Sequence, residues 1–151
     1  AAQQGVIAVP QPVFLDELGD NFIASLDDRF LQRCYPIKTL TDYGIRYALS
    51  TDAPVVKNFN PFNNIAAAVT RKTRTGNIIS VGESISVAEA IEAYTMGSAW
   101  AEGTEQVKGS IEPGKYADFI MLDRNPLETP VEELSQINPL AVTVNGRTTE
   151  I

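Results

Sequence analysis

The chain has 151 residues, of which 44% are hydrophobic and 21% charged, a composition typical of a globular protein of ordinary domain size. Its 19 acidic and 12 basic residues give a net charge of −7, which argues against a nucleic-acid-binding surface. The chain has no histidine and a single cysteine, Cys34. A His-dependent catalytic triad is therefore excluded, and so is the set of imidazoles and thiolates that most transition-metal sites use.

The amino-acid sequence also indicates in which cellular compartment to expect the protein. No apolar run approaches the ~20 residues that cross a bilayer. The opening segment, AAQQGVIAVPQP, lacks the basic and long apolar regions of a signal peptide. A lone cysteine forms no internal disulfide and suits a reducing compartment. We therefore expect a cytoplasmic protein without membrane contact, in which Cys34 is a structural thiol.

The first third of the chain reads as a strand, a helix and a second strand. Residues 6–9 form a short apolar run that ends at Pro10. Residues 36–43 are predicted to be helical, because proline suits a first helical turn and Gly44 supplies a left-handed stop. Residues 45–50 alternate in the manner of a strand. This order predicts a βαβ unit with parallel strands.

The second predicted strand leads directly to an acid, in the stretch IRYALSTDAPV. Two interpretations of Asp52 are open on local residues alone. Short acids often satisfy backbone donors in turns, which makes Asp52 a turn former. Alternatively, the acid lies at the carboxyl end of a parallel strand, where α/β folds place their chemistry.

Two further helices are predicted downstream. Residues 62–71 carry apolar side chains at helical spacing after a loop rich in asparagine and proline. Ser86 and Glu89 have the spacing of a capping box, and the helix that they open is predicted to run to Gly103.

The tail changes to β-rich patterns. Pro113-Gly114 suits a type II turn, and Phe119–Leu122 is a nearly continuous apolar strand. Thr129 is predicted to cap a short helix over residues 130–134. Asn145-Gly146 lies between two strand-like runs and predicts a hairpin with a type I′ turn.

Several segments resemble a known family when taken together and in order. These segments are LSTDAPV, NPFNNIAAAVTR, ISVAEAIEAYTMGSAWA, KGSIEPGKYADFIMLDRNP and VTVNGR. They resemble the carboxyl-terminal portion of the amidohydrolase superfamily, in particular the branch of N-substituted formamide deformylases, whose members are metal-dependent amide hydrolases. The resemblance covers nearly the whole chain, and GSIEPGKYADFIMLD is its most specific part.

The resemblance implies an α/β fold. Residues 1–103 would be the last strands and helices of a (β/α)8 TIM-type barrel, and residues 104–151 would be part of a small C-terminal β-sandwich. Residues 45–50 would form the last barrel strand and residues 6–9 the strand before it. A complete barrel needs about 250 residues, so the chain is expected to be a fragment of a larger fold.

The resemblance also assigns roles to single residues. Asp52 matches the acid that ends the eighth strand, touches the metal and handles the proton of the bound water. It is thus the expected catalytic residue and, in a complete barrel, a metal ligand. Gln11, Asn60 and Arg71 are expected to bind substrate, although a structural ion pair is the favoured alternative for Arg71. Phe14 stands where relatives often carry a polar or histidine side chain, so no substrate contact is assigned to it.

The metal ligands of the family are mainly histidines, and this chain has none. The resemblance therefore implies zinc or another divalent metal in a full-length parent and none in this chain alone. The expected function is that of a catalytically incomplete piece of an enzyme that uses metal-activated water to cleave an amide or related C–N bond in a small molecule.

Strands taken out of a barrel leave unpaired edges and uncovered apolar faces. We therefore expect either self-association or a complementary N-terminal chain as partner. The alternative function is a non-catalytic assembly or binding module derived from the end of a hydrolase. A small α/β binding protein unrelated to hydrolases is a third, less favoured interpretation.

Overall fold

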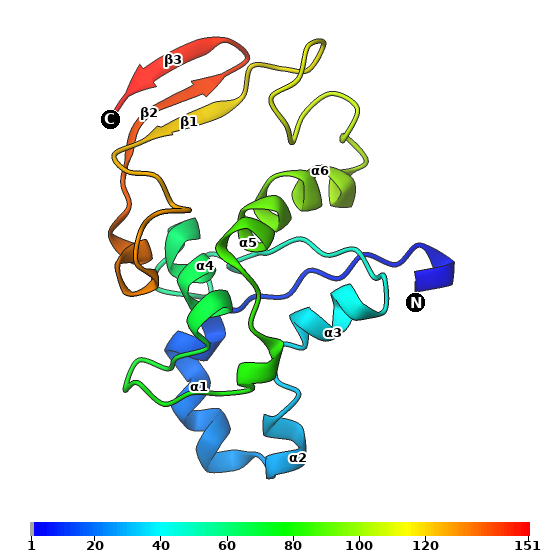
Figure 1. Ribbon diagram of the computed structural model, residues 1–151, viewed down its shortest axis with the longest axis vertical. Coiled ribbons are helices and arrows are strands. Elements are labelled where there is room, and N and C mark those ends of the chain that lie inside the picture. Colours follow the sequence, from blue (N-terminus) through cyan, green and yellow to red (C-terminus); the bar gives the residue numbers. More distant parts are fainter. Residues whose placement is uncertain (1) are drawn as a thin grey trace.

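The computed structural model describes residues 2–151. A three-stranded sheet lies at one end of an elongated molecule, and helices α1 and α2 lie at the other (Figure 1). Among the described residues no helix combines the length and the apolar character needed to cross a membrane. With η for a 3-10 helix, the elements are η1 (Ala2–Gln4), α1 (Val13–Ser25), α2 (Asp28–Leu31), α3 (Ile37–Asp42), α4 (Pro61–Thr70), η2 (Val81–Glu83), α5 (Val87–Tyr94), α6 (Met96–Glu102), β1 (Phe119–Leu122), η3 (Val131–Gln136), β2 (Pro139–Val144) and β3 (Arg147–Glu150).

The two predicted parallel strands pair in the expected direction but do not become full strands. Residues 8 and 47 form an isolated parallel bridge. The backbone bonds are Ala8 N to Arg46 O at 3.0 Å, Ala48 N to Ala8 O at 2.9 Å and Ser50 N to Pro10 O at 3.1 Å. The prediction of two extended strands is thus wrong in extent. Proline at residues 10 and 12 removes the amide donors that would continue the ladder.

The predicted helices are largely confirmed. Helix α3 ends before Gly44, whose φ of +65° is the left-handed stop. The Ser86–Glu89 capping box starts α5, with Ser86 N donating to the Glu89 carboxylate at 2.7 Å. The helix predicted to continue to Gly103 instead breaks at Thr95, which separates α5 from α6.

The break lets α6 approach the 45–50 segment very closely. A Cβ atom added to Gly97 would lie 2.4 Å from the carbonyl oxygen of Tyr47. The Leu49 amide also donates to the carbonyl of Ala93, at 3.3 Å. Glycine at residue 97 is therefore required by contact between two backbones rather than by a turn.

Helix α1 has no counterpart among the predicted elements. It follows Pro12 without a side-chain cap, it packs on α4, and its Val13 and Leu15 side chains are buried. At its other side, Asp20 accepts hydrogen bonds from Thr73, Thr75 and Asn77 at 2.7 to 3.0 Å. These bonds hold the pKa of the Asp20 carboxyl below its usual value, led by the bond from Thr75. Helix α1 is thus held in place by tertiary contacts that no local sequence motif predicts.

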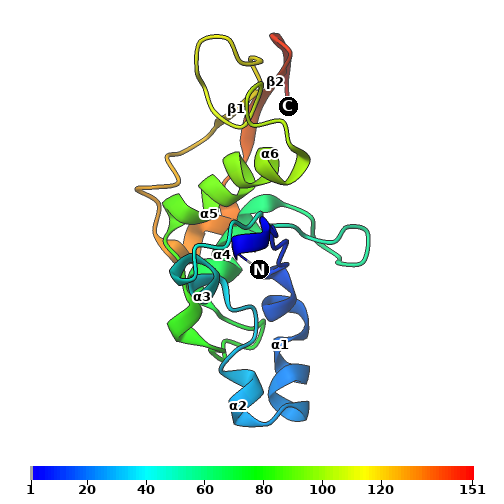
Figure 2. The ribbon, with the colours of Figure 1, turned by 90° about the vertical axis from the view of Figure 1, so that its right-hand side faces the viewer.

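The hydrophobic core lies between α4, α5 and the segments around them, at the centre of the molecule (Figures 1 and 2). Leu134 and Ile137, from the region of η3, are fully buried in this core beside Leu49 and Ile65. Residues on both sides of the predicted domain boundary at 103/104 therefore share one core. The division into residues 1–103 and 104–151 stays a prediction.

The tail forms an antiparallel sheet in the order β1-β2-β3. The predicted turns are confirmed: Asn145 and Gly146 both have positive φ, and Gly114, with φ +93°, follows Pro113. Lys115 N closes that turn onto Glu112 O at 3.2 Å. The predicted cap at Thr129 is wrong, because its hydroxyl donates to the carbonyl of Asn125 at 2.7 Å while Pro130 occupies the cap of η3.

Replacing Gly97 with alanine is expected to destabilise the chain by about 1–3 kcal/mol, because the new methyl group collides with the Tyr47 carbonyl and overpacks the contact. The loss should outweigh the gain in helix propensity of alanine. Urea unfolding of the purified variant measures it. The control is Gly82→Ala, where an added Cβ meets nothing within 4 Å. Equal stability of the two variants would refute the close-contact explanation.

Candidate active-site edge

Asp52 lies just beyond the end of the parallel pair. Its side chain is exposed, and its backbone is left-handed, with φ +58°. The Asp52 amide donates to Ser50 Oγ at 3.2 Å, and the Asp52 carbonyl accepts from Val55 N at 2.9 Å. These bonds form a tight turn that leaves the carboxylate free toward solvent. Asp52 is thus both the end of a parallel-paired segment and part of a turn, so the two interpretations of this residue are compatible.

The loop that follows Asp52 projects from the body of the molecule before α4 begins (Figure 2). Asn60 ends this loop, and its side chain accepts from Phe62 N at 2.9 Å as the N-cap of α4. Gln11, at the end of the neighbouring segment, is half-buried and donates to Val9 O at 2.7 Å. Because Ser50 N bonds to Pro10 O, the two segments lie side by side just before Gln11 in one and Asp52 in the other. Substrate binding by Gln11 and Asn60 stays a prediction.

Arg71 lies away from this edge in the interior. It is fully buried and left-handed, with φ +59°, just after α4. Its guanidinium donates to Ile79 O and Tyr35 O, both at 3.2 Å, and to Cys34 O at 2.5 Å. Burial lowers the pKa of Arg71 to about 10, so the side chain stays charged at neutral pH.

Within residues 2–151 no carboxylate forms a salt bridge with Arg71, so the expected structural ion pair is replaced by bonds to carbonyls. Each of the three guanidinium nitrogens donates to a backbone carbonyl, so carbonyl dipoles compensate for part of the cost of burying the charge. The observed contacts give Arg71 a structural role, and a further role in substrate binding stays a prediction.

Arg71 fixes the backbone of Tyr35, a residue that the sequence did not single out. Tyr35 has φ +50° and packs edge-on against Phe14, with ring centroids 6.4 Å apart. Burial raises the pKa of the Tyr35 hydroxyl to about 12. Cys34 and, more weakly, Asp52 add to this rise, whereas the charge of Arg71 opposes it. Phe14 thus belongs to an aromatic cluster with Tyr35 and Phe22 rather than to a polar one.

Asn64 is the second residue that sequence patterns missed. It is fully buried on α4. Its Oδ1 accepts from Val13 N at 2.5 Å, and its Nδ2 donates to Ser50 O at 2.8 Å and to the Tyr94 hydroxyl at 2.5 Å. A polar residue among the apolar positions of the predicted helix was the only available signal.

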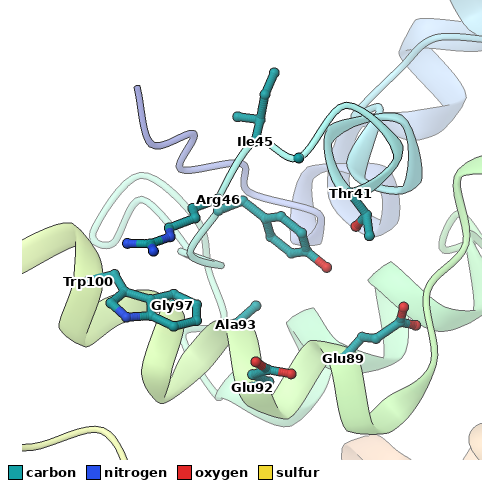
Figure 3. A pocket seen from close by; sticks show the side chains of 10 residues that line it. Thr41, Ile45, Arg46, Glu89, Glu92, Ala93, Gly97 and Trp100 are labelled. Atoms are coloured by element: carbon teal, nitrogen blue, oxygen red, sulfur yellow. The ribbon is translucent and has the colours of Figure 1, made fainter. Parts of the chain in front are cut away.

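A cavity of about 340 Å³ opens near the start of the 45–50 segment, at the other end from Asp52 (Figure 3). Trp100 and Arg46 lie at one side of it and Thr41 and Glu89 at the other. The Arg46 guanidinium stacks over the Trp100 ring at 4.8 Å. Trp100 is therefore engaged in packing with Arg46, as its size favours.

Among residues 2–151 no group of three or more His, Cys, Asp or Glu side chains is placed to hold a metal ion. At this edge the described residues offer the exposed carboxylate of Asp52.

Comparison with known proteins gives the context of this edge. The chain matches the model of the Amidohydrolase family over residues 1–149. It is 32% identical over 114 residues to N-substituted formamide deformylase of Arthrobacter pascens, covering 76% of this chain and 21% of that protein. It is 32% identical over 151 residues to the putative amidohydrolase YtcJ of Bacillus subtilis, covering 93% of this chain and 28% of that protein.

Solved structures agree with these matches. An uncharacterized metal-dependent hydrolase of Pyrococcus horikoshii superposes with a TM-score of 0.74 at 26% identity, covering 87% of this chain and 27% of that one. One from Pyrococcus furiosus superposes with a TM-score of 0.69 at 31% identity, covering 84% and 25%. The chain thus spans roughly a quarter of the length of these relatives, between 21% and 28%. By the match over nearly its whole length, the chain belongs to the amidohydrolase family.

Proposed function

We propose that this chain is the carboxyl-terminal part of a metal-dependent hydrolase that cleaves an amide or related C–N bond in a small molecule by metal-activated water. Two findings support the proposal: the family membership and the 32% identity to N-substituted formamide deformylase. The single observation that carries it is the exposed carboxylate of Asp52 at the end of a parallel-paired segment. Parallel α/β folds place reacting groups at this end of their strands.

The proposed fold places residues 45–50 on the last strand of a (β/α)8 barrel and residues 6–9 on the strand before it. The parallel bridge between residues 8 and 47 supports this arrangement. The antiparallel sheet β1-β2-β3 would be part of the appended β-sandwich. Under the proposal, the remaining strands belong to polypeptide outside these 151 residues.

The metal, zinc or another divalent ion, would be held mainly by residues that this chain does not contain. The chain has no histidine, and among residues 2–151 no three His, Cys, Asp or Glu side chains are grouped to hold a metal, so only the part played by Asp52 follows from this chain. A carboxylate within hydrogen-bond reach of an attacking water accepts its proton and returns it to the departing amine. The exposed, solvent-facing position of Asp52 suits this task, and Gln11 would form part of the adjacent rim of the substrate pocket.

A second candidate function is a non-catalytic assembly module. The observation that favours it is the exposure of several apolar side chains on the sheet. Ile120, Met121 and Val144 are all more than half exposed, at 51%, 56% and 60%. Strands β1 and β3 are also edges of the sheet, with unpaired backbone groups. Either a complementary N-terminal chain or a second copy of this chain would cover this surface.

In the gene product extended upstream to include the missing strands, Asp52→Asn is expected to lower kcat at least about 100-fold, because an amide accepts no proton from water. The measurement is zinc-loaded turnover of N-acyl and N-formyl amines. Thermal unfolding should be nearly unchanged, since the Asp52 side chain is exposed. Asp42→Asn, which removes an exposed carboxylate paired with Lys38 on α3, is the matched control and should retain activity. Near-normal turnover of the Asp52 variant would remove this residue from the mechanism.

The 151-residue chain by itself is expected to self-associate through its uncovered sheet, and light scattering at several concentrations measures this. Ile120→Lys should reduce the apparent mass, because a charge on an edge strand opposes strand pairing. Val81→Lys changes an apolar side chain that is 67% exposed on η2, outside the sheet, and should leave the mass unchanged. A monodisperse monomer of the unmodified chain would contradict the expected association.

A further inference from the structure

Asn64 connects the ends of the two parallel-paired segments. Its carbonyl oxygen accepts from Val13 N, which follows the segment that carries Gln11. Its amide nitrogen donates to Ser50 O, at the end of the segment that leads to Asp52. The same nitrogen reaches the Tyr94 hydroxyl on α5. One buried side chain thus joins both segment ends and two helices.

The orientation of the Asn64 amide is fixed by its backbone partners. A backbone N–H only donates and a backbone carbonyl only accepts, so Oδ1 must face Val13 and Nδ2 must face Ser50. Aspartate has the same shape but lacks the donor. At residue 64 it would keep the bond from Val13 and place a carboxylate oxygen against the Ser50 carbonyl.

Ser50 links this contact to Asp52. The Ser50 carbonyl is held by Asn64, its amide is held by Pro10 O, and its hydroxyl accepts from the Asp52 amide. The backbone of Ser50 is therefore fixed on two sides, and the turn that carries Asp52 is tied to it. A shift of Ser50 would carry the carboxylate with it.

We propose that Asn64 is a positioning residue that holds Asp52 at the reacting edge through the Ser50 carbonyl. The inference rests on the proposed function for its catalytic consequence, although its structural part stands alone. Asn64 does not touch the reacting atoms, so its effect is on the geometry of Asp52. A displacement of about 1 Å at a reacting group costs up to about 100-fold in rate.

The first test uses the upstream-extended enzyme. Asn64→Asp is expected to lower kcat at least about 10-fold with little change in KM, because the bond near Gln11 is kept and only the Ser50 side is disturbed. In an Asp52→Asn background, Asn64→Asp should lower kcat by less than a further factor of about 2. The effects of two substitutions that act through the same group are not additive. Ile65→Val, a mild change at the next buried residue of α4, is the control and should retain kcat.

The second test needs no activity. In the 151-residue chain, Asn64→Asp should speed hydrogen exchange of the Ser50 amide about 10-fold relative to that of Ala99, whose amide bonds to Thr95 O in α6. Equal acceleration at both amides would mean general destabilisation and would overturn the positioning role. If Asn64→Asp does not fold, Ser50→Ala replaces it, because it removes only the acceptor of the Asp52 amide. Made in the upstream-extended enzyme, that variant should lose kcat without a change in Tm, and unchanged kcat would overturn the link.

The two proposals fail in different ways. Normal turnover of Asp52→Asn would overturn the proposed function and the catalytic part of this inference together. The exchange measurement would still decide whether Asn64 holds the end of the segment. Full additivity of the double variant, with Asp52 essential, would overturn the inference and leave the proposed function intact.

Discussion

The position of Asp52 depends on the alignment of two short parallel segments whose ends are tied to the same buried amide. Three backbone bonds pair residues 8–10 with residues 46–50, and no longer ladder supports them. So short a pairing has little stability of its own, because within residues 2–151 neither segment pairs with a further strand. The side-chain bonds of Asn64 and the close contact at Gly97 supply the missing support from α4 and α6. The candidate active-site edge is thus a product of the helices packed behind it.

Local sequence patterns found the features that have local causes. The capping box at Ser86, the left-handed stop at Gly44 and the Asn145-Gly146 turn each depend on a few neighbouring residues, and all three are present. Helix α1 was missed because it lacks a side-chain cap and is stabilised by packing on α4. The break at Thr95 could not be predicted either, because the close contact that it permits joins Gly97 to Tyr47, fifty residues earlier in the chain.

The residues of the candidate site also differ in whether local sequence or tertiary contacts determine their roles. Asp52 was identified because a motif and a predicted strand end coincide, and the structure places it at the end of the parallel pair. Arg71 was assigned to the substrate or to an ion pair, whereas its guanidinium meets only backbone carbonyls, which have no sequence signature. The role of Asn64 could not be predicted for the same reason, because two of its partners are backbone groups distant in sequence.

The most direct test of this account is a crystal structure of the upstream-extended protein loaded with zinc, with the metal located by anomalous scattering. The account predicts histidine ligands from the added polypeptide and an Asp52 carboxylate oxygen at the ion, at about 2.0–2.2 Å for a direct ligand. It also predicts that the bond from Asn64 to Ser50 is retained. A metal bound elsewhere, with Asp52 turned away from it, would contradict the central claim.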